Sequence, residues 1–111
     1  MWIMIAAPYT SGGTDAALRA ARLAEMNRAA LAILRLGHVP VIGVNMALPI
    51  IAAAEADVFD EVMMPISLAL AERCDAVLRI GGPSQGADQE VARLRQAGKP
   101  VFRTLAEIPT G

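Results

Sequence analysis

Short apolar runs alternate along this chain with segments of helical periodicity, and this alternation restricts the fold more than any other feature. The runs cover residues 2–7, 39–44, 76–80 and 101–102. Apolar runs of this length without polar alternation are typical of strands buried on both faces of a sheet. The connections between them are too long for hairpins, so the strands are expected to be parallel and joined by helices.

We therefore predict a three-layer α/β fold, a Rossmann- or flavodoxin-like doubly wound parallel sheet of about four to five strands. The expected strand order is 2-1-3-4, with a fifth strand either missing or very short. Ligands bind such sheets beyond the carboxyl ends of the strands, where the strand order reverses. The predicted site thus lies at the loops that follow the first and third strands. The length of 111 residues predicts one domain spanning 1–111.

The first helix is predicted over residues 15–36. Thr14 is expected to cap it, with Asp15 in the first turn and Gly37 just past the end. The middle of the chain is harder to place. Pro49 and Pro65 each suit a first helical turn.

These prolines predict one helix through residues 50–54, followed by a loop, and another over residues 66–73. A last helix is expected over residues 87–97, closed by Gly98.

Composition restricts the class of partner. The formal net charge is -1 with both signs interspersed, which predicts neither a nucleic-acid polymer nor a membrane as partner, and favours a small molecule. Cys74 is the only cysteine, so we expect no disulfide, no metal site and a cytoplasmic location. The 55% share of hydrophobic residues predicts a homo-oligomer with a buried interface.

The loop after the first strand contains the first group of candidate binding residues, Tyr9, Thr10, Ser11, Gly12 and Gly13. It leads into the long helix, whose dipole and free backbone N–H groups favour an anion. The alternative is that the glycines only make the turn. A flavin-binding interpretation also remains, although few aromatic residues are available to stack on a flavin.

The loop after the third strand contains the second group. Ser84 and Gly86 precede a helix whose first turn is expected to hold Glu90. The helix dipole there favours an ionised carboxylate, which suits a nucleophile more than a general acid. The alternative is that the acidic residue only stabilises the helix.

The segments 83–90 (PSQGADQE) and 98–101 (GKPV) resemble the nucleoside 2-deoxyribosyltransferase superfamily, and in particular its deoxynucleoside 5′-monophosphate N-glycosidase branch. The segments 5–9 (IAAPY) and 37–40 (GHVP) are similar to the N-terminal half of the same superfamily. The matches follow the family order over most of the chain, and 45–64 is the weakest part.

The resemblance implies that Glu90 is the catalytic nucleophile, attacking C1′ of a deoxyribosyl group. It implies that Ser84 and Gly86, together with residues 9–13, hold the sugar or its 5′-phosphate. The implied partner is a nucleoside or nucleotide with no cofactor, and the implied assembly is a dimer or tetramer.

The chain departs from the family at Ser67, where the superfamily generally has an Asp. A hydroxyl cannot protonate a leaving base as a carboxylic acid does. Asp57, Asp60 or Glu61 is a candidate substitute. A nucleotide-binding module of the same fold without catalysis is therefore the alternative function.

Three other residues call for interpretation. Arg79 lies near the end of a strand predicted to be buried, so it is expected to pair with a carboxylate, to reach an anionic ligand or to occupy an edge. His38 follows a helix end and is expected to be structural. Cys74 is expected to be a small buried hydrophobic residue.

Overall fold

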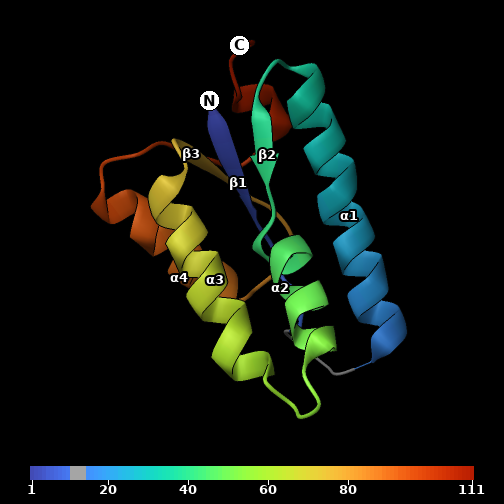
Figure 1. The fold of residues 1–111 in the computed structure, drawn as a ribbon. Helices are drawn as coiled ribbons and strands as arrows, with labels where there is room; N and C mark the ends of the chain where they lie inside the picture. Colours follow the sequence, from blue (N-terminus) through green and yellow to red (C-terminus); the bar gives the residue numbers. More distant parts are fainter. Residues whose placement is uncertain (11–14) are drawn as a thin grey trace.

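Four parallel strands form the centre of the computed structural model, which describes residues 1–10 and 15–111 (Figure 1). They are β1 (Trp2–Ala6), β2 (Val39–Val41), β3 (Ala76–Arg79) and β4 (Val101–Phe102). Their order is β2-β1-β3-β4, with every neighbouring pair parallel. The predicted α/β fold and strand order 2-1-3-4 are confirmed, and the described residues contain no fifth strand.

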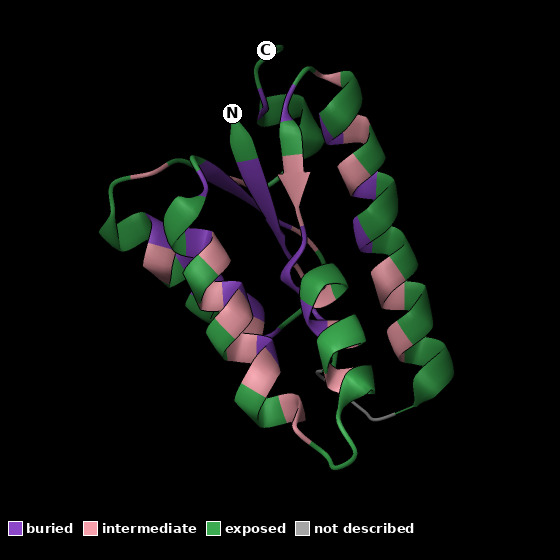
Figure 2. Ribbon diagram, in the orientation of Figure 1, coloured by how far each residue is buried: buried purple, intermediate pink, exposed green. Residues whose placement is uncertain are grey.

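Helices cover both faces of the sheet. Ile3 and Ile5 of β1 pack on the side of α1 (Ala16–Arg35) and the short 3-10 helix η1 (Leu105–Glu107). Met4 and Ala6 face the opposite side, toward α3 (Phe59–Arg73) and α4 (Gln85–Gln96). The helix α2 (Gly43–Ala53) follows β2 and packs against α3. Figure 2 shows most of β1 and β3 buried between these layers, as expected for strands made largely of apolar residues.

The start of α1 differs from the prediction. Asp15 is not in the first turn but is the N-cap, and its Oδ1 accepts hydrogen bonds from the backbone N–H groups of Ala17 (2.7 Å) and Leu18 (3.3 Å). Thr14, the predicted cap, lies outside the described residues. The predicted end is confirmed, since Gly37 follows the helix with a φ of 94°, a conformation that suits glycine.

The predicted starts of the two middle helices are wrong. Pro49 and Pro65 lie inside α2 and α3 and not in their first turns. A proline in a helix interior removes one backbone hydrogen bond and strains the preceding turn. The packing of α2 against α3 offsets this cost.

The ends of two strands also differ from the prediction. β2 stops at Val41 and β3 at Arg79, before the predicted ends at residues 44 and 80. Pro40 lies in the edge strand β2, in agreement with the expectation that it belongs to an edge or a strand start. The chain turns into α2 directly after Ile42, so residues 42–44 lie at the carboxyl edge of the sheet.

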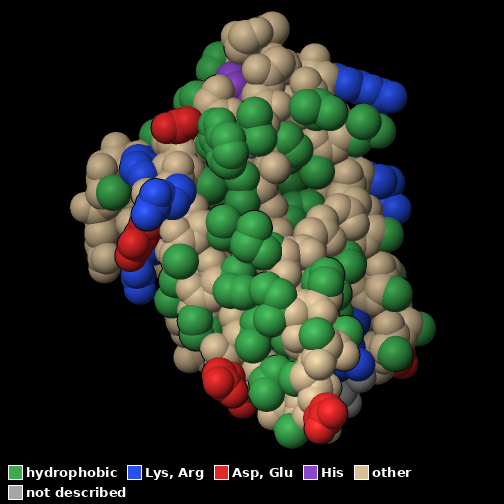
Figure 3. Space-filling view, in the orientation of Figure 1, with side chains coloured by type: hydrophobic (Ala, Val, Ile, Leu, Met, Phe, Trp, Pro, Cys, Tyr) green, Lys and Arg blue, Asp and Glu red, His purple; other side chains and the backbone are tan. Residues whose placement is uncertain are grey.

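Hydrophobic side chains gather on the face in front of α2, α3 and the start of β1 (Figure 3). The large exposed hydrophobic residues include Trp2, Val39, Met46 and Ile50, each more than 40% exposed. Within the described part of the chain, no helix is long and apolar enough to cross a membrane.

Candidate functional site

The loops that follow β1 and β3 lie side by side at the carboxyl edge of the sheet. β1 and β3 are the central neighbours, and the backbone N–H of Ile80 donates to the carbonyl of Ala6 (3.1 Å) just beyond the ladder. Gly81 has a φ of 79°, and a Cβ on it would lie 2.6 Å from Cδ of Pro8. The close approach of the two loops therefore requires glycine at this position.

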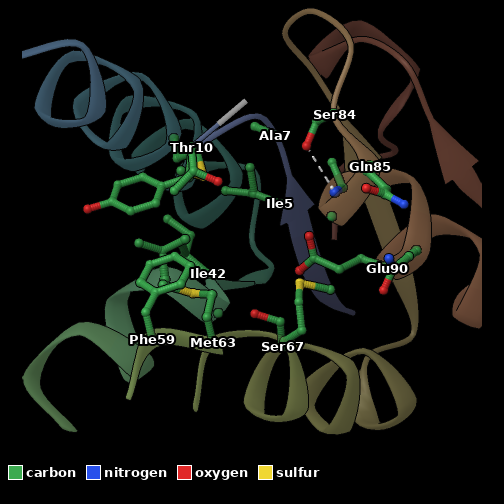
Figure 4. Close-up of a pocket in the computed structure, with 18 of the residues that line it drawn as sticks. Ile5, Ala7, Thr10, Ile42, Phe59, Met63, Ser67, Ser84, Gln85 and Glu90 are labelled. Carbon is green, nitrogen blue, oxygen red and sulfur yellow. Dashed lines mark hydrogen bonds between the residues drawn. The ribbon is translucent and has the colours of Figure 1, made fainter. Parts of the chain in front are cut away.

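A cavity of about 320 Å³ lies beneath these loops. This is within the size range of small-molecule sites, about 300–1,000 Å³. It is bounded by the carboxyl edge of the sheet, the start of α2, α3 and the first two turns of α4 (Figure 4). Its apolar lining includes Ile5, Met26, Ile42, Val44, Phe59, Met63 and Met64. Its polar lining includes Tyr9, Thr10, Asp60, Ser67, Ser84, Gln85, Gln89 and Glu90.

The N-terminus of α4 forms one wall. Ser84 is its N-cap, and the Ser84 hydroxyl accepts a hydrogen bond from the backbone N–H of Ala87 (3.1 Å). Gly86 lies in the first turn, where a Cβ would come within 3.3 Å of the Met64 sulfur. A ligand beside Gly86 would meet helix backbone and the positive end of the helix dipole.

Glu90 lies in the second turn of α4, one turn later than the sequence analysis placed it. It belongs to the buried face of the helix with Ala87, Val91 and Leu94, the spacing expected of a core-facing stripe. Its side chain is only 8% exposed and points into the cavity (Figure 4). Among the described residues, none donates a hydrogen bond to its carboxyl group.

The predicted ionisation of Glu90 is wrong. Burial raises the pKa of Glu90 to about 8, and the positive charge of Arg79 opposes this rise only in part. Removal from water penalises the charged form, and the dipole weakens beyond the first turn of the helix. At neutral pH the carboxyl group is therefore mostly protonated.

Arg79 lies in the central strand β3 and not at an edge. Its Nε donates a hydrogen bond to Oδ1 of Asp88 (3.2 Å). This agrees with the expectation that Arg79 pairs with a carboxylate. Its two terminal nitrogens donate to the carbonyls of Ile80 (2.5 Å) and Gly82 (2.8 Å). The guanidinium group thus holds the third-strand loop against the start of α4.

Ser67 faces Glu90 from the other side of the cavity, on α3 (Figure 4). The side chain is 3% exposed. Gly43, the first residue of α2, lies so close that a Cβ on it would overlap the Ser67 hydroxyl. A small residue at 43 and a short side chain at 67 together keep α2 and α3 in contact at this point.

The structure brings five of the predicted site residues to one cavity: Tyr9, Thr10, Ser84, Gly86 and Glu90. Ser11, Gly12 and Gly13 lie outside the described residues. Of the three candidate substitutes for the family Asp, Asp60 lines the cavity, and Asp57 accepts a hydrogen bond from the backbone N–H of Phe59 (3.1 Å) at the start of α3.

The sequence analysis missed the wall formed by α3, which supplies Phe59, Met63 and Met64. The predicted helix began after Pro65 and so left these residues in a loop. The apolar residues Phe59, Met63, Ile66 and Leu70 recur at helical spacing, and this signal could have extended the helix toward Phe59.

His38 and Cys74 have structural roles. His38 is buried, accepting at Nδ1 from the Met1 amino group (2.8 Å), while Nε2 donates to the Pro109 carbonyl (2.5 Å). Cys74 is 1% exposed, and burial raises its pKa to about 11. The described residues contain no cluster of three His, Cys, Asp or Glu side chains suited to a metal.

A family model described as a domain of unknown function, DUF1937, matches residues 1–106. The chain belongs to the DUF1937 family. No curated protein matches this DUF1937 chain. Among solved structures, it is similar to a 2-deoxyribosyltransferase from the psychrotolerant bacterium Bacillus psychrosaccharolyticus, with a TM-score of 0.63 and 20% sequence identity. The match covers 91% of the DUF1937 chain and 69% of the transferase, and it establishes a shared fold.

Proposed function

We propose that this DUF1937 protein cleaves or transfers the N-glycosidic bond of nucleosides, deoxynucleosides or their 5′-monophosphates, with Glu90 as the attacking carboxylate. One observation carries the proposal. A carboxyl group without a hydrogen-bond partner among the described residues points into a cavity of small-molecule size, at the point where the strand order reverses. The fold shared with a 2-deoxyribosyltransferase supports it.

In the proposed reaction a carboxylate oxygen of Glu90 attacks C1′ while the bond from C1′ to the base nitrogen breaks. The transition state is oxocarbenium-like, and the product is a glycosyl ester of Glu90 with the free base. Water, or a second base, then attacks C1′ and releases Glu90. Once Glu90 is ionised, its burial favours this reaction because it strengthens the interaction with the positive charge that develops on the sugar.

The substrate is proposed to bind between the two loops. Ser84 and Gly86, at the start of α4, would contact the sugar or its 5′-phosphate, where the helix dipole favours oxygen atoms of negative charge. Tyr9 and Thr10 would contact it from the opposite loop. Ser11, Gly12 and Gly13, which continue that loop in the sequence, are proposed to take part.

Base release is the test. The purified protein is incubated with a panel of nucleosides, 2′-deoxynucleosides and their 5′-monophosphates, and free base is measured by chromatography. We expect release from at least one member, and a loss of two orders of magnitude or more in Glu90→Gln, because an amide cannot form the ester. Glu55→Gln, which changes an exposed loop carboxyl, is the matched control. No release from any member, or equal rates for wild type and Glu90→Gln, would refute the proposal.

A nucleotide-binding module without catalysis is the second candidate. Ser67 favours it, because this buried position beside Glu90 offers a hydroxyl and no acid to protonate a leaving base. A ligand that raises the melting temperature and is recovered chemically intact would identify this function.

The assembly is proposed to be a homo-oligomer, a dimer or tetramer. The exposed side chains of Trp2, Val39, Met46 and Ile50 support this proposal. Figure 3 shows hydrophobic side chains gathered on one face of the molecule. Light scattering coupled to size-exclusion chromatography measures the mass directly, and a monomer at all concentrations would contradict it.

A further inference from the structure

The charge of the cavity lining has one sign. Its ionisable acidic groups are Glu90, deep in the cavity, and Asp60, in the first turn of α3. No lysine or arginine is among the described lining residues, and residues 11–14 are uncharged in the sequence. A ligand in this cavity would therefore meet two carboxyl groups and no cationic side chain among the described lining residues. A positively charged ligand beside Glu90 would favour the ionised form of that carboxyl group.

The cation that acts on Glu90 from outside the lining is Arg79. Its three side-chain nitrogens donate hydrogen bonds to Asp88, to the Ile80 carbonyl and to the Gly82 carbonyl. Asp88 is exposed and lies on the outer side of α4, the helix that also carries Glu90. The guanidinium group is thus committed to the loop and to Asp88, and it forms no hydrogen bond with the Glu90 carboxyl group.

The wall opposite the start of α4 suits a positively charged ring. Phe59 and Met63 lie together across the cavity from Ser84 and Gln85 (Figure 4). Tyr9 also lines the cavity. The face of an aromatic ring attracts a cation, and a thioether is polarisable. An aromatic cation placed here would contact these side chains while its sugar reached Glu90.

The departure of the base from C1′ also favours a substrate whose base is positively charged. A neutral base leaves readily only when it is protonated, and Glu90 cannot attack C1′ as a carboxylate and donate a proton in the same step. Ser67, the polar side chain facing Glu90 from α3, is a hydroxyl and not an acid. Asp60, the other carboxyl group of the lining, lies about two helical turns before Ser67, at the start of α3. A base that already bears a positive charge needs no proton, because it becomes neutral as it leaves.

We propose that this cavity recognises N-glycosides whose base carries a fixed positive charge, such as an N7-alkylated purine or an N-substituted pyridinium. The inference rests on the proposed function for its catalytic part, while its recognition part stands on the lining of the cavity. Neutral nucleosides and nucleosides with a cationic base differ in charge at the ring that faces Phe59 and Met63.

The reaction is balanced without a further reactant except water. A Glu90 oxygen forms a bond to C1′, and the electron pair of the C1′–N bond passes to the base, which departs as a neutral molecule. The negative charge of Glu90 and the positive charge of the base are both lost in this step. Water then attacks C1′, giving the free sugar, the Glu90 carboxylate and one proton.

Recognition is tested with analogues that cannot be cleaved. The carbocyclic analogue of N7-methyl-2′-deoxyguanosine is charged, and the carbocyclic analogue of 7-methyl-7-deaza-2′-deoxyguanosine has the same shape without the charge. Calorimetric titration should show that the wild type binds the charged analogue about tenfold or more tightly. The preference should largely disappear in Glu90→Gln and persist in Glu55→Gln. Equal affinities in the wild type, or no binding of either analogue, would overturn the inference.

Catalysis is measured separately, as base release from N7-methyl-2′-deoxyguanosine and from 2′-deoxyguanosine, each corrected for its spontaneous rate. Faster enzymatic release from the charged substrate supports the inference. Equal release from both substrates would overturn it and leave the proposed function intact. A tenfold binding preference with no release from any substrate would support the recognition and refute the proposed catalysis.

Discussion

Replacing Glu90 with glutamine should make the protein more stable at alkaline pH, because the folded state holds this carboxyl group away from water. The pKa of Glu90 rises from 4.5 to about 8 on folding. Below pH 4.5 both states are protonated and the group has no effect. Between the two values the unfolded chain is ionised while the folded chain keeps its proton, so the free energy of unfolding falls as pH rises. Above about 8 the full penalty is present.

The magnitude follows from the size of the shift. The pKa shift lowers the free energy of unfolding of the wild type by about 3 kcal/mol at pH 7 and about 5 kcal/mol at pH 9. Glu90→Gln keeps the shape of the side chain and removes the titration. Its free energy of unfolding should therefore exceed that of the wild type by these amounts, and the two should converge near pH 4.5.

Urea denaturation followed by circular dichroism at pH 5, 7 and 9 measures the difference. Glu55→Gln, at an exposed loop position, should follow the wild type at every pH. Parallel curves for wild type and Glu90→Gln would refute the account, since they would show that the folded protein leaves the Glu90 carboxyl group in water.

A pH profile and further substitutions test Glu90 and its surroundings. Base release, measured as kcat/KM, should rise with pH up to about 8, because the attacking form of Glu90 is the ionised one; a profile that falls over this range would identify Glu90 as an acid. Arg79→Gln should shift that profile to higher pH, since Arg79 lowers the pKa of Glu90, and an unshifted profile would count against this coupling. Ser84→Ala should lower the free energy of unfolding by about 0.5–2 kcal/mol through loss of the α4 cap, measured by urea denaturation; no loss would mean that the cap contributes nothing. Gly43→Ala should cost about 1–3 kcal/mol by overlap with the Ser67 hydroxyl, and Ser67→Gly should restore part of this loss; absence of rescue would place the strain elsewhere.

The order of the sheet could be predicted because each strand is a short, mainly apolar run, with Arg79 as the charged exception in β3. Trp2–Ala6 and Ala76–Arg79 are recognisable without tertiary information, and the order follows from general rules for parallel sheets. The same rules placed the site beside the two loops. Local periodicity and topology therefore decide this part of the fold.

The middle of the chain could not be predicted in the same way. Pro65 has a strong local preference for the first turn of a helix, yet it lies inside α3, where packing against α2 and α4 offsets the lost hydrogen bond. The cavity wall at Phe59 and Met63 was missed as a result. Tertiary contacts decided the outcome at Pro65, although the apolar spacing from Phe59 onward gave a local signal for the longer helix.

The protonation state of Glu90 illustrates a second limit. From the sequence it was an acidic residue near a helix start, where the dipole favours ionisation. In the fold it lies one turn further along and on the buried face of α4, so desolvation dominates. Position along a helix can be predicted from sequence within a turn, but a pKa depends on which atoms surround the group.

The central claim is that Glu90 forms a covalent bond to the sugar. It is tested most directly by mixing the protein with a substrate that releases base, quenching rapidly in acid and mapping the adduct by peptide mass spectrometry. The account predicts a mass increase of one glycosyl group on the peptide that contains Glu90, and none in Glu90→Gln. Base release with no adduct, or with an adduct on another residue, would contradict it.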